Sequence, residues 1–178
     1  MSTPLFARRR EAIAAAVAAL TLLAVVVELL WPRPAFHITN AQIGSKRIGD
    51  RTQLFANIYF NNDGDAADYR WSAATGLVLS GVSAAQELTF VRKLEAAAAA
   101  PGDADKHPPF TVRHGEDRWF TVFGPTLGRE DFRRFVAGGS AFYFAATIDA
   151  RENVVGHTTL SFCGFNPGGS PLDIHPCP

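Results

Sequence analysis

The chain has 178 residues, of which 47% are hydrophobic and 19% charged, so it can bury the core of one ordinary domain and is not a disordered chain. Its 17 basic and 17 acidic residues cancel. Because they form neither a basic stripe nor an acidic tail, the composition argues against nucleic acid as a partner.

The first apolar segment runs from Ala12 to Trp31, and its one charged residue is Glu28, near the far end. A helix of this length, at about 1.5 Å per residue, spans about 30 Å, the thickness of a bilayer's hydrocarbon core. The arginines at 8–10 precede it, so the positive-inside rule places the N-terminus in the cytoplasm. We therefore predict a cytoplasmic tail over residues 1–11, a transmembrane helix in the lipid bilayer over 12–31, and a periplasmic domain over 32–178 of a bacterial cytoplasmic (inner) membrane protein.

A cleaved signal peptide is the competing interpretation of this segment. Such a peptide has an apolar stretch of about 7–15 residues and a small-x-small cleavage site. The uncharged run from Ala12 to Val27 is longer, and the residues ELLWPRP that follow it offer no pair of small residues before a cut. The pattern favours an uncleaved signal anchor.

The rest of the chain shows short β-type runs, rich in aromatic and β-branched residues, that recur about every ten residues between turn formers. This spacing predicts a mainly β domain, an immunoglobulin-like antiparallel β-sandwich, after the single N-terminal transmembrane helix. We expect strands over 35–43, 52–62, 68–73, 76–82, 87–94, 109–114, 118–124, 140–149 and 157–163. In one of them a single face collects Leu54, Ala56, Ile58 and Phe60.

Two segments interrupt the strands. Residues 93–109 contain an alanine run that predicts a helical turn or two, stopped by Pro101, and then an exposed, mobile loop. Residues 128–139 predict a short helix, because Phe132, Phe135 and Val136 fall on one helical face and Gly138 follows.

The last third of the chain holds four residues of the types that bind zinc or copper: His157, Cys163, His175 and Cys177. Geometry counts against the full set, because six strand residues at about 3.3 Å each put His157 about 20 Å from Cys163. Ligands of one metal lie only about 4 Å apart. A smaller site built from Cys163, His175 and Cys177 stays open as the alternative.

A disulfide between Cys163 and Cys177 is the preferred prediction. Outside the cytoplasm paired cysteines are normally oxidised, which also opposes a nucleophilic cysteine with a histidine base. The loop Asn166-Pro167-Gly168-Gly169 is flexible enough to turn the tail back. On the returning strand we expect Leu160 and Phe162 to face the core, with Cys163 on the more polar face. The tail would then lie over that face, beside Thr159 and Ser161.

No catalytic or cofactor motif stands out. The chain has no G-x-S-x-G and no phosphate-binding glycine loop that opens a helix. We therefore predict no catalytic residue, no bound cofactor and no resident metal, and expect a protein that is not an enzyme.

The outer domain resembles a widespread set of uncharacterised bacterial single-pass membrane proteins, each with one N-terminal membrane helix and a small extracytoplasmic β-sandwich domain. The matching residues are the turn Asn62-x-Gly64-x-x-Ala67, then Asp149, Gly156-His157-Thr158-Thr159 and Phe162-Cys163, with a final Cys177. Thr147 departs from that pattern, since an aromatic residue is frequent there. The resemblance implies the topology and no activity.

Architecture and the absence of motifs together lead to a functional expectation. We expect a binding or accessory component of an envelope complex, with a protein partner in the cell envelope. The alternative is a metal-handling (copper or zinc) or thiol-dependent envelope protein that uses Cys163, Cys177 and His175. The copper-delivering assembly factor of cytochrome oxidase has a similar architecture, but its Cys-x-Cys ligands are absent, because Gly164-Phe165 follows Cys163.

Overall fold

The computed structural model describes residues 16–26, 34–100, 110–151, 157–170 and 173–178, which belong to two units that divide between Arg33 and Pro34. In the first unit residues 16–26 are helical. The other residues of the predicted membrane segment 12–31 lie outside the described part of the chain. Within that part, no helix is both long enough and apolar enough to cross a membrane.

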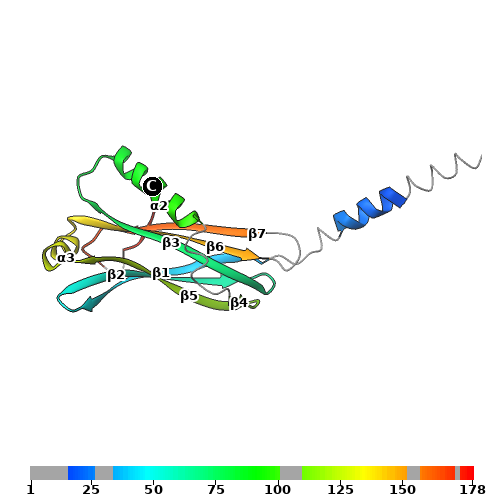
Figure 1. Ribbon diagram of the computed structural model, residues 1–178, viewed down its shortest axis with the longest axis horizontal. Helices are drawn as coiled ribbons and strands as arrows, with labels where there is room; N and C mark the ends of the chain where they lie inside the picture. Colours follow the sequence, from blue (N-terminus) through cyan, green and yellow to red (C-terminus); the bar gives the residue numbers. More distant parts are fainter. Residues whose placement is uncertain (1–15, 27–33, 101–109, 152–156, 171–172) are drawn as a thin grey trace, which may run out of the picture. The chain divides into compact units, whose positions relative to one another are not determined.

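The second unit is built mainly from β-strands in two antiparallel sheets (Figure 1), which is the architecture of a β-sandwich, as predicted. Sheet A has the order β1 (Phe36–Ile48), β2 (Arg51–Asn62), β5 (Glu116–Leu127). Sheet B has the order β4 (Phe110–Val112), β3 (Ala67–Leu79), β6 (Ser140–Arg151), β7 (His157–Asn166), β8 (His175–Pro176).

The main core lies between the two sheets. Alternate residues of a strand face the same side, so each strand contributes every second side chain. The four residues predicted to share one face of β2 are buried there: Leu54, Ala56, Ile58 and Phe60. Alternate residues of β6 are buried opposite them: Phe142, Phe144, Ala146 and Ile148. Leu160 and Phe162 of β7 pack against this core, as expected.

The prediction of a strand over 87–94 is wrong, because these residues belong to helix α2 (Ala84–Ala99). Ser83 and Gln86 form a capping box that fixes the start of the helix: the Ser83 hydroxyl accepts from the Gln86 N–H, and the Gln86 side chain accepts from the Ser83 N–H. The buried residues Val91, Leu94 and Ala98 follow helical spacing. The alanine run favours helix, and it is longer than the predicted turn or two.

One further strand differs from the prediction, and one helix agrees with it. Strand β3 is continuous where two strands, 68–73 and 76–82, were expected, because it pairs with β6 along its whole length. Helix α3 (Arg129–Val136) forms where the short helix was predicted. The expected mobile loop falls largely on 101–109, which lie outside the described residues.

Candidate binding surface

The two cysteines are joined as predicted. Cys163 and Cys177 form a disulfide with their Cα atoms 5.5 Å apart. The tail runs as strand β8 beside the end of β7, where Gly164 pairs with Pro176 and Phe165 with His175. It therefore does not lie beside Thr159 and Ser161, because the backbone pairing of β8 holds it further along the strand. The face that carries Cys163 is also less polar than expected, since α2 covers it.

The alternative metal-ligand set, Cys163, His175 and Cys177, lies where β7 meets β8, but its two cysteines form a disulfide. The two sulfur atoms are bonded to each other, so neither is a thiolate able to bind a metal. The His175 ring lies 5.4 Å from the ring of Phe165, centroid to centroid. His157 begins β7, six residues before Cys163 on one unbroken strand. Among the described residues no group of three or more His, Cys, Asp or Glu side chains is placed to hold a metal.

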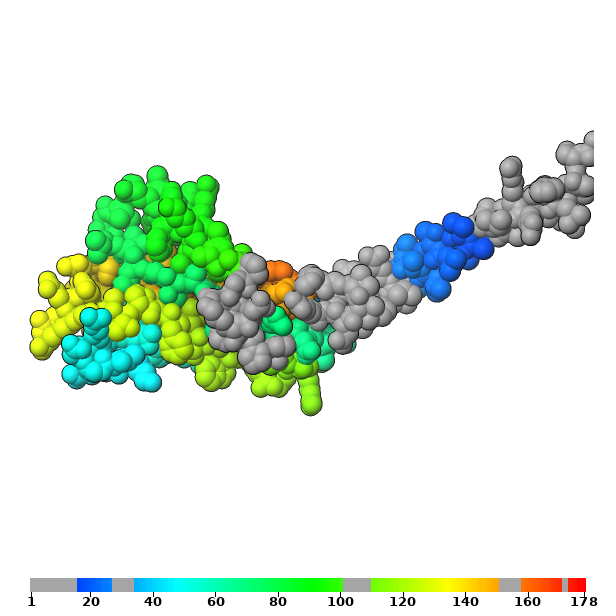
Figure 2. Space-filling model, in the orientation of Figure 1, coloured from blue at the N-terminus to red at the C-terminus, as the bar shows by residue number. Residues whose placement is uncertain are grey.

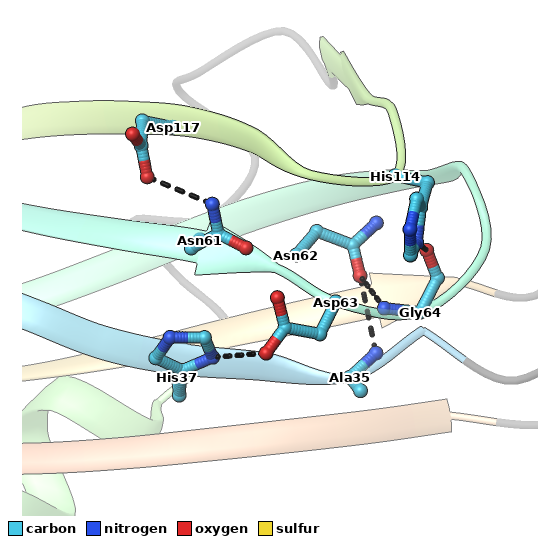
Figure 3. A network of polar contacts seen from close by, with 8 residues as sticks. All are labelled: Ala35, His37, Asn61, Asn62, Asp63, Gly64, His114 and Asp117. Carbon is cyan, nitrogen blue, oxygen red and sulfur yellow. Dashed lines mark hydrogen bonds and ion pairs between the residues drawn. The ribbon is translucent and has the colours of Figure 1, made fainter.

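The turn quoted for the resemblance is a structural junction (Figure 3). The Asn62 side chain is fully buried, and its Oδ1 accepts from the backbone N–H groups of Ala35 at 3.1 Å and Gly64 at 3.0 Å. Its Nδ2 donates to the backbone carbonyls of Asp65 and Val112. One amide thus ties the start of the sandwich to the turn after β2 and to the end of β4.

Two histidines border this junction. His37 Nδ1 lies 3.3 Å from an Asp63 carboxylate oxygen, and His114 Nδ1 lies 3.1 Å from the Gly64 carbonyl (Figure 3). Both contacts are on the surface and involve residues of the turn itself. They extend the structural network around Asn62 and form no catalytic arrangement of nucleophile, base and orienting acid.

The strongest candidate for a functional surface is the outer face of sheet A, which we call the aromatic face. Paired side chains of β2 and β5 alternate there in type along the strands. From one end, Asn61 stands opposite Asp117, Tyr59 opposite Trp119, Asn57 opposite Thr121, and Phe55 opposite Phe123. The polar pairs are hydrogen-bonded, Asn61 Nδ2 to Asp117 at 2.8 Å and the Thr121 hydroxyl to Asn57 Oδ1 at 2.8 Å. The face therefore presents two aromatic pairs separated by a fixed polar pair.

The aromatic side chains are held in place by the sheet, and Trp119 and Phe123 are open to solvent, whereas Tyr59 and Phe55 are partly buried. Trp119 is 59% exposed and Phe123 is 61% exposed. The Tyr59 and Trp119 ring centroids are 6.5 Å apart. The Phe55 ring lies over Gly44 of β1, where any Cβ would stand only 2.3 Å from it. Large apolar side chains gathered on an open face are unusual on a soluble domain and mark interaction surfaces.

Few charged residues lie on the aromatic face. The side chains with shifted pKa values are on sheet B. The charged residues among its alternate positions are Asp117 at one end and Lys46 and Arg51 at the other. The raised pKa values belong to tyrosines on sheet B. Burial raises the pKa of Tyr69 in the inter-sheet core. Burial, then the hydrogen bond and charge of Glu87, raise that of Tyr143 beneath α2.

Sequence reasoning did not single out the aromatic face, although a signal was present. The run Trp119-Phe120-Thr121-Val122-Phe123 is apolar on both strand faces. The structure buries Phe120 and Val122 in the core and leaves the other apolar side chains outside. A strand that is apolar on both faces needs a packed layer on each side. A second apolar face on β5 therefore indicates a surface that a partner could cover.

No protein-family model matches the chain, and no curated protein matches it. The assignment of function therefore depends on the surface geometry.

Proposed function

We propose that this chain is a single-pass membrane protein whose extracytoplasmic, immunoglobulin-like β-sandwich is a non-enzymatic binding module, with the aromatic face as its contact surface for a protein partner of the cell envelope. The observation that carries the proposal is the two aromatic cross-strand pairs, Tyr59–Trp119 and Phe55–Phe123, in which the β5 member of each pair is more than half exposed. Protein interfaces are enriched in Tyr, Trp and Phe and depleted of charge at their centre, and this face has both properties.

The geometry also suits tight packing against a partner. Side chains on successive outward positions of a strand stand about 7 Å apart, so the two aromatic pairs lie roughly 13 Å from each other. Two anchors at that spacing can enter two pockets while the Asn57–Thr121 pair between them offers hydrogen bonds. Ring positions fixed by the sheet lower the entropy lost on binding.

Two features support the proposed compartment. A disulfide persists in an oxidising environment, so the Cys163–Cys177 bond supports a domain outside the cytoplasm. The arginines before the apolar segment 12–31 support a cytoplasmic N-terminus and an uncleaved anchor. A reporter that is active only outside the cytoplasm, fused after Pro178, should be active, and activity of a cytoplasmic reporter there would contradict this orientation.

Site-specific photocrosslinking in intact cells tests the contact surface. A photoreactive phenylalanine analogue replaces Phe123 in the full chain, and the matched control carries it at Leu88, an exposed apolar residue of α2. We expect a discrete adduct from position 123 that is absent from position 88, and that disappears when Trp119→Ala is added. Equal adducts from both positions, or an adduct that persists with Trp119→Ala, would contradict a partner bound at the aromatic face.

A further inference from the structure

The structure also contains an open strand edge on sheet B. Strand β8 pairs with only two residues of β7, Gly164 and Phe165. The part of β7 before Cys163 pairs with β6 on one side and with no described strand on the other. Such an edge presents backbone N–H and C=O groups that can form a ladder with another strand.

The direction of the backbone groups defines the open stretch. The Cys177 N–H donates to the Cys163 carbonyl at 3.3 Å, so Cys163 directs its backbone groups away from β6. In an antiparallel strand alternate residues direct these groups to the same side, so Thr159 and Ser161 do the same. Residues 175–177 therefore lie beside β7 as far back as Cys163. The open stretch is therefore 157–161, with Thr159 at its centre.

The other sheet edges carry features that discourage strand addition, and this stretch does not. Strand β1 has a bulge between Ile38 and Asn40 and then the charges of Lys46 and Arg47. Strand β5 contains Pro125 and lies against β3, where the Thr75 hydroxyl donates to the Phe123 carbonyl at 3.2 Å. Strand β4 is only three residues long. The open stretch HTTLS has no proline, lysine, arginine or carboxylate.

We propose that residues 157–161 of β7 pair antiparallel with the same residues of a second copy of this chain, joining two copies of sheet B across a two-fold axis. Self-pairing brings identical surfaces together, so an edge that carries charges of one sign would repel itself. The uncharged stretch avoids that repulsion. Because Thr159 is central, it stands opposite its counterpart, and Ser161 stands opposite position 157 of the second copy.

The proposed contact is chemically consistent on both sides of the sheet. Thr159 and Ser161 are exposed, and facing threonines are a favourable cross-strand pair. Leu160 lies on the side that packs against the core. The ladder is short, so we expect weak pairing in dilute solution that is promoted where a membrane anchor holds copies close together. The aromatic face on sheet A remains free, so this pairing does not depend on the proposed binding surface.

A cysteine trap in the full chain, in native membranes, tests the pairing. Directly opposite, hydrogen-bonded residues of antiparallel strands have Cα atoms about 5.5 Å apart, within the range that a disulfide spans. Thr159→Cys should give a covalent dimer on mild oxidation. With two differently tagged copies in the same membrane, capture through one tag should bring down the other. Thr111→Cys, at an exposed threonine of the edge strand β4, is the matched control and should give none.

A second variant separates edge pairing from chance collision. Ser161→Pro removes an N–H that points to the open edge, so pairing with β6 keeps its hydrogen bonds. Added to Thr159→Cys, it should lower the dimer yield at least about tenfold, because two hydrogen bonds are lost across the axis. Ser161→Ala keeps the N–H and should leave the yield unchanged. Absence of a Thr159→Cys dimer, an equal dimer from Thr111→Cys, insensitivity to Ser161→Pro, or a link only to a different protein would each overturn the proposal.

Discussion

The outer faces of the two sheets differ: a helix covers that of sheet B, and that of sheet A exposes aromatic side chains. The outer face of sheet B carries small residues such as Ala74, Gly76 and Ala145, and helix α2 lies over them (Figures 1 and 2). The outer face of sheet A carries two aromatic cross-strand pairs, and Trp119 and Phe123 of these pairs are more than half exposed. Figure 2 shows the side chains of α2 (green) on one side and those of β2 (cyan) and β5 (yellow-green) on the other.

The contrast between the two faces separates a packing face from a contact face. A helix approaches a sheet closely only where the strand residues are small: a Cβ on Gly76 would stand 2.5 Å from the Phe90 ring of α2. On sheet A the ring of Phe55 lies over Gly44. Phe55 belongs to the neighbouring strand of the same sheet, so this contact brings no second layer onto the face. Aromatic residues occur on both outer faces, since Tyr143 lies beneath α2, but small residues that admit a helix mark the face that the chain covers itself, and exposed aromatic residues mark the face left for a partner.

The first prediction removes contacts from the covered face. Leu94 of α2 is only 6% exposed and packs against sheet B, so Leu94→Ala leaves a cavity beneath the helix. We expect the free energy of unfolding to fall by about 3–4 kcal/mol, measured by urea denaturation. Leu88→Ala, on the same helix but 38% exposed, is the control and should lower it by less than about 1 kcal/mol. Equal effects would mean that α2 does not form a second core with sheet B.

The second prediction concerns the disulfide at the border of the covered face. Replacing Cys163 and Cys177 with serine should lower the free energy of unfolding by about 2–3 kcal/mol, because the unfolded chain gains the freedom of a loop of about 15 residues. Reductant should have a similar effect on the unaltered domain and none on the variant. Intact-mass analysis should show the oxidised chain about 2 Da lighter than the reduced one. Stability that does not change in the variant would show that the bond constrains little.

Much of sheet A and of the inter-sheet core followed from the sequence. The alternation in 52–62 and 140–149 has a period of two and one fully apolar face, which leaves little choice of which face is buried. The disulfide followed from compartment and loop flexibility. These features depend on local pattern or on covalent chemistry, which a single sequence carries directly.

Helix α2, which forms the layer over sheet B, was not predicted. Its capping residues indicate a helix, but the strand-favouring residues within 87–94 were given more weight. Residues 87–94 contain Phe90 and Val91, which favour strand, and the deciding capping pair Ser83 and Gln86 lies just before them. With a strand predicted over 87–94, the face of β7 that carries Cys163 is expected to be the more polar one. The burial of Tyr143 therefore could not be anticipated, since it depends on which layer covers the strand.

The third prediction uses the tyrosines whose pKa values are raised by burial. Tyr143 has an ordinary pKa of 10.0 when unfolded, and burial and Glu87 raise it in the folded domain. Below pH 10 both states hold the proton; above it the unfolded chain loses the proton first, so stability falls as pH rises. Each such tyrosine contributes a slope of up to about 1.4 kcal/mol per pH unit.

Tyr143→Phe should therefore flatten the loss of stability above about pH 10, measured by urea denaturation across the alkaline range. At neutral pH the same variant should lose about 1 kcal/mol with the hydrogen bond to Glu87. Tyr69→Phe is the companion variant: its hydroxyl is buried without a partner among the described residues, so it should flatten the slope with little loss at neutral pH. An unchanged slope in both variants would show that other groups govern the alkaline transition.

The last prediction has the smallest effect on stability and the largest on contact. Trp119 and Phe123 leave more than half of their surface in solvent, so replacing both with alanine should change the free energy of unfolding by less than about 1 kcal/mol. Leu79→Ala, at 57% exposure on β3, should be equally mild. The two changes should differ in contact: crosslinking from a photoreactive group at Tyr59 should be lost in the aromatic variant and kept with Leu79→Ala. Trp119→Phe keeps an aromatic ring opposite Tyr59, so it should retain part of the crosslinking. If the aromatic variant instead unfolds as readily as Leu94→Ala, these side chains hold the fold together, and the open face is no more a contact surface than the covered one.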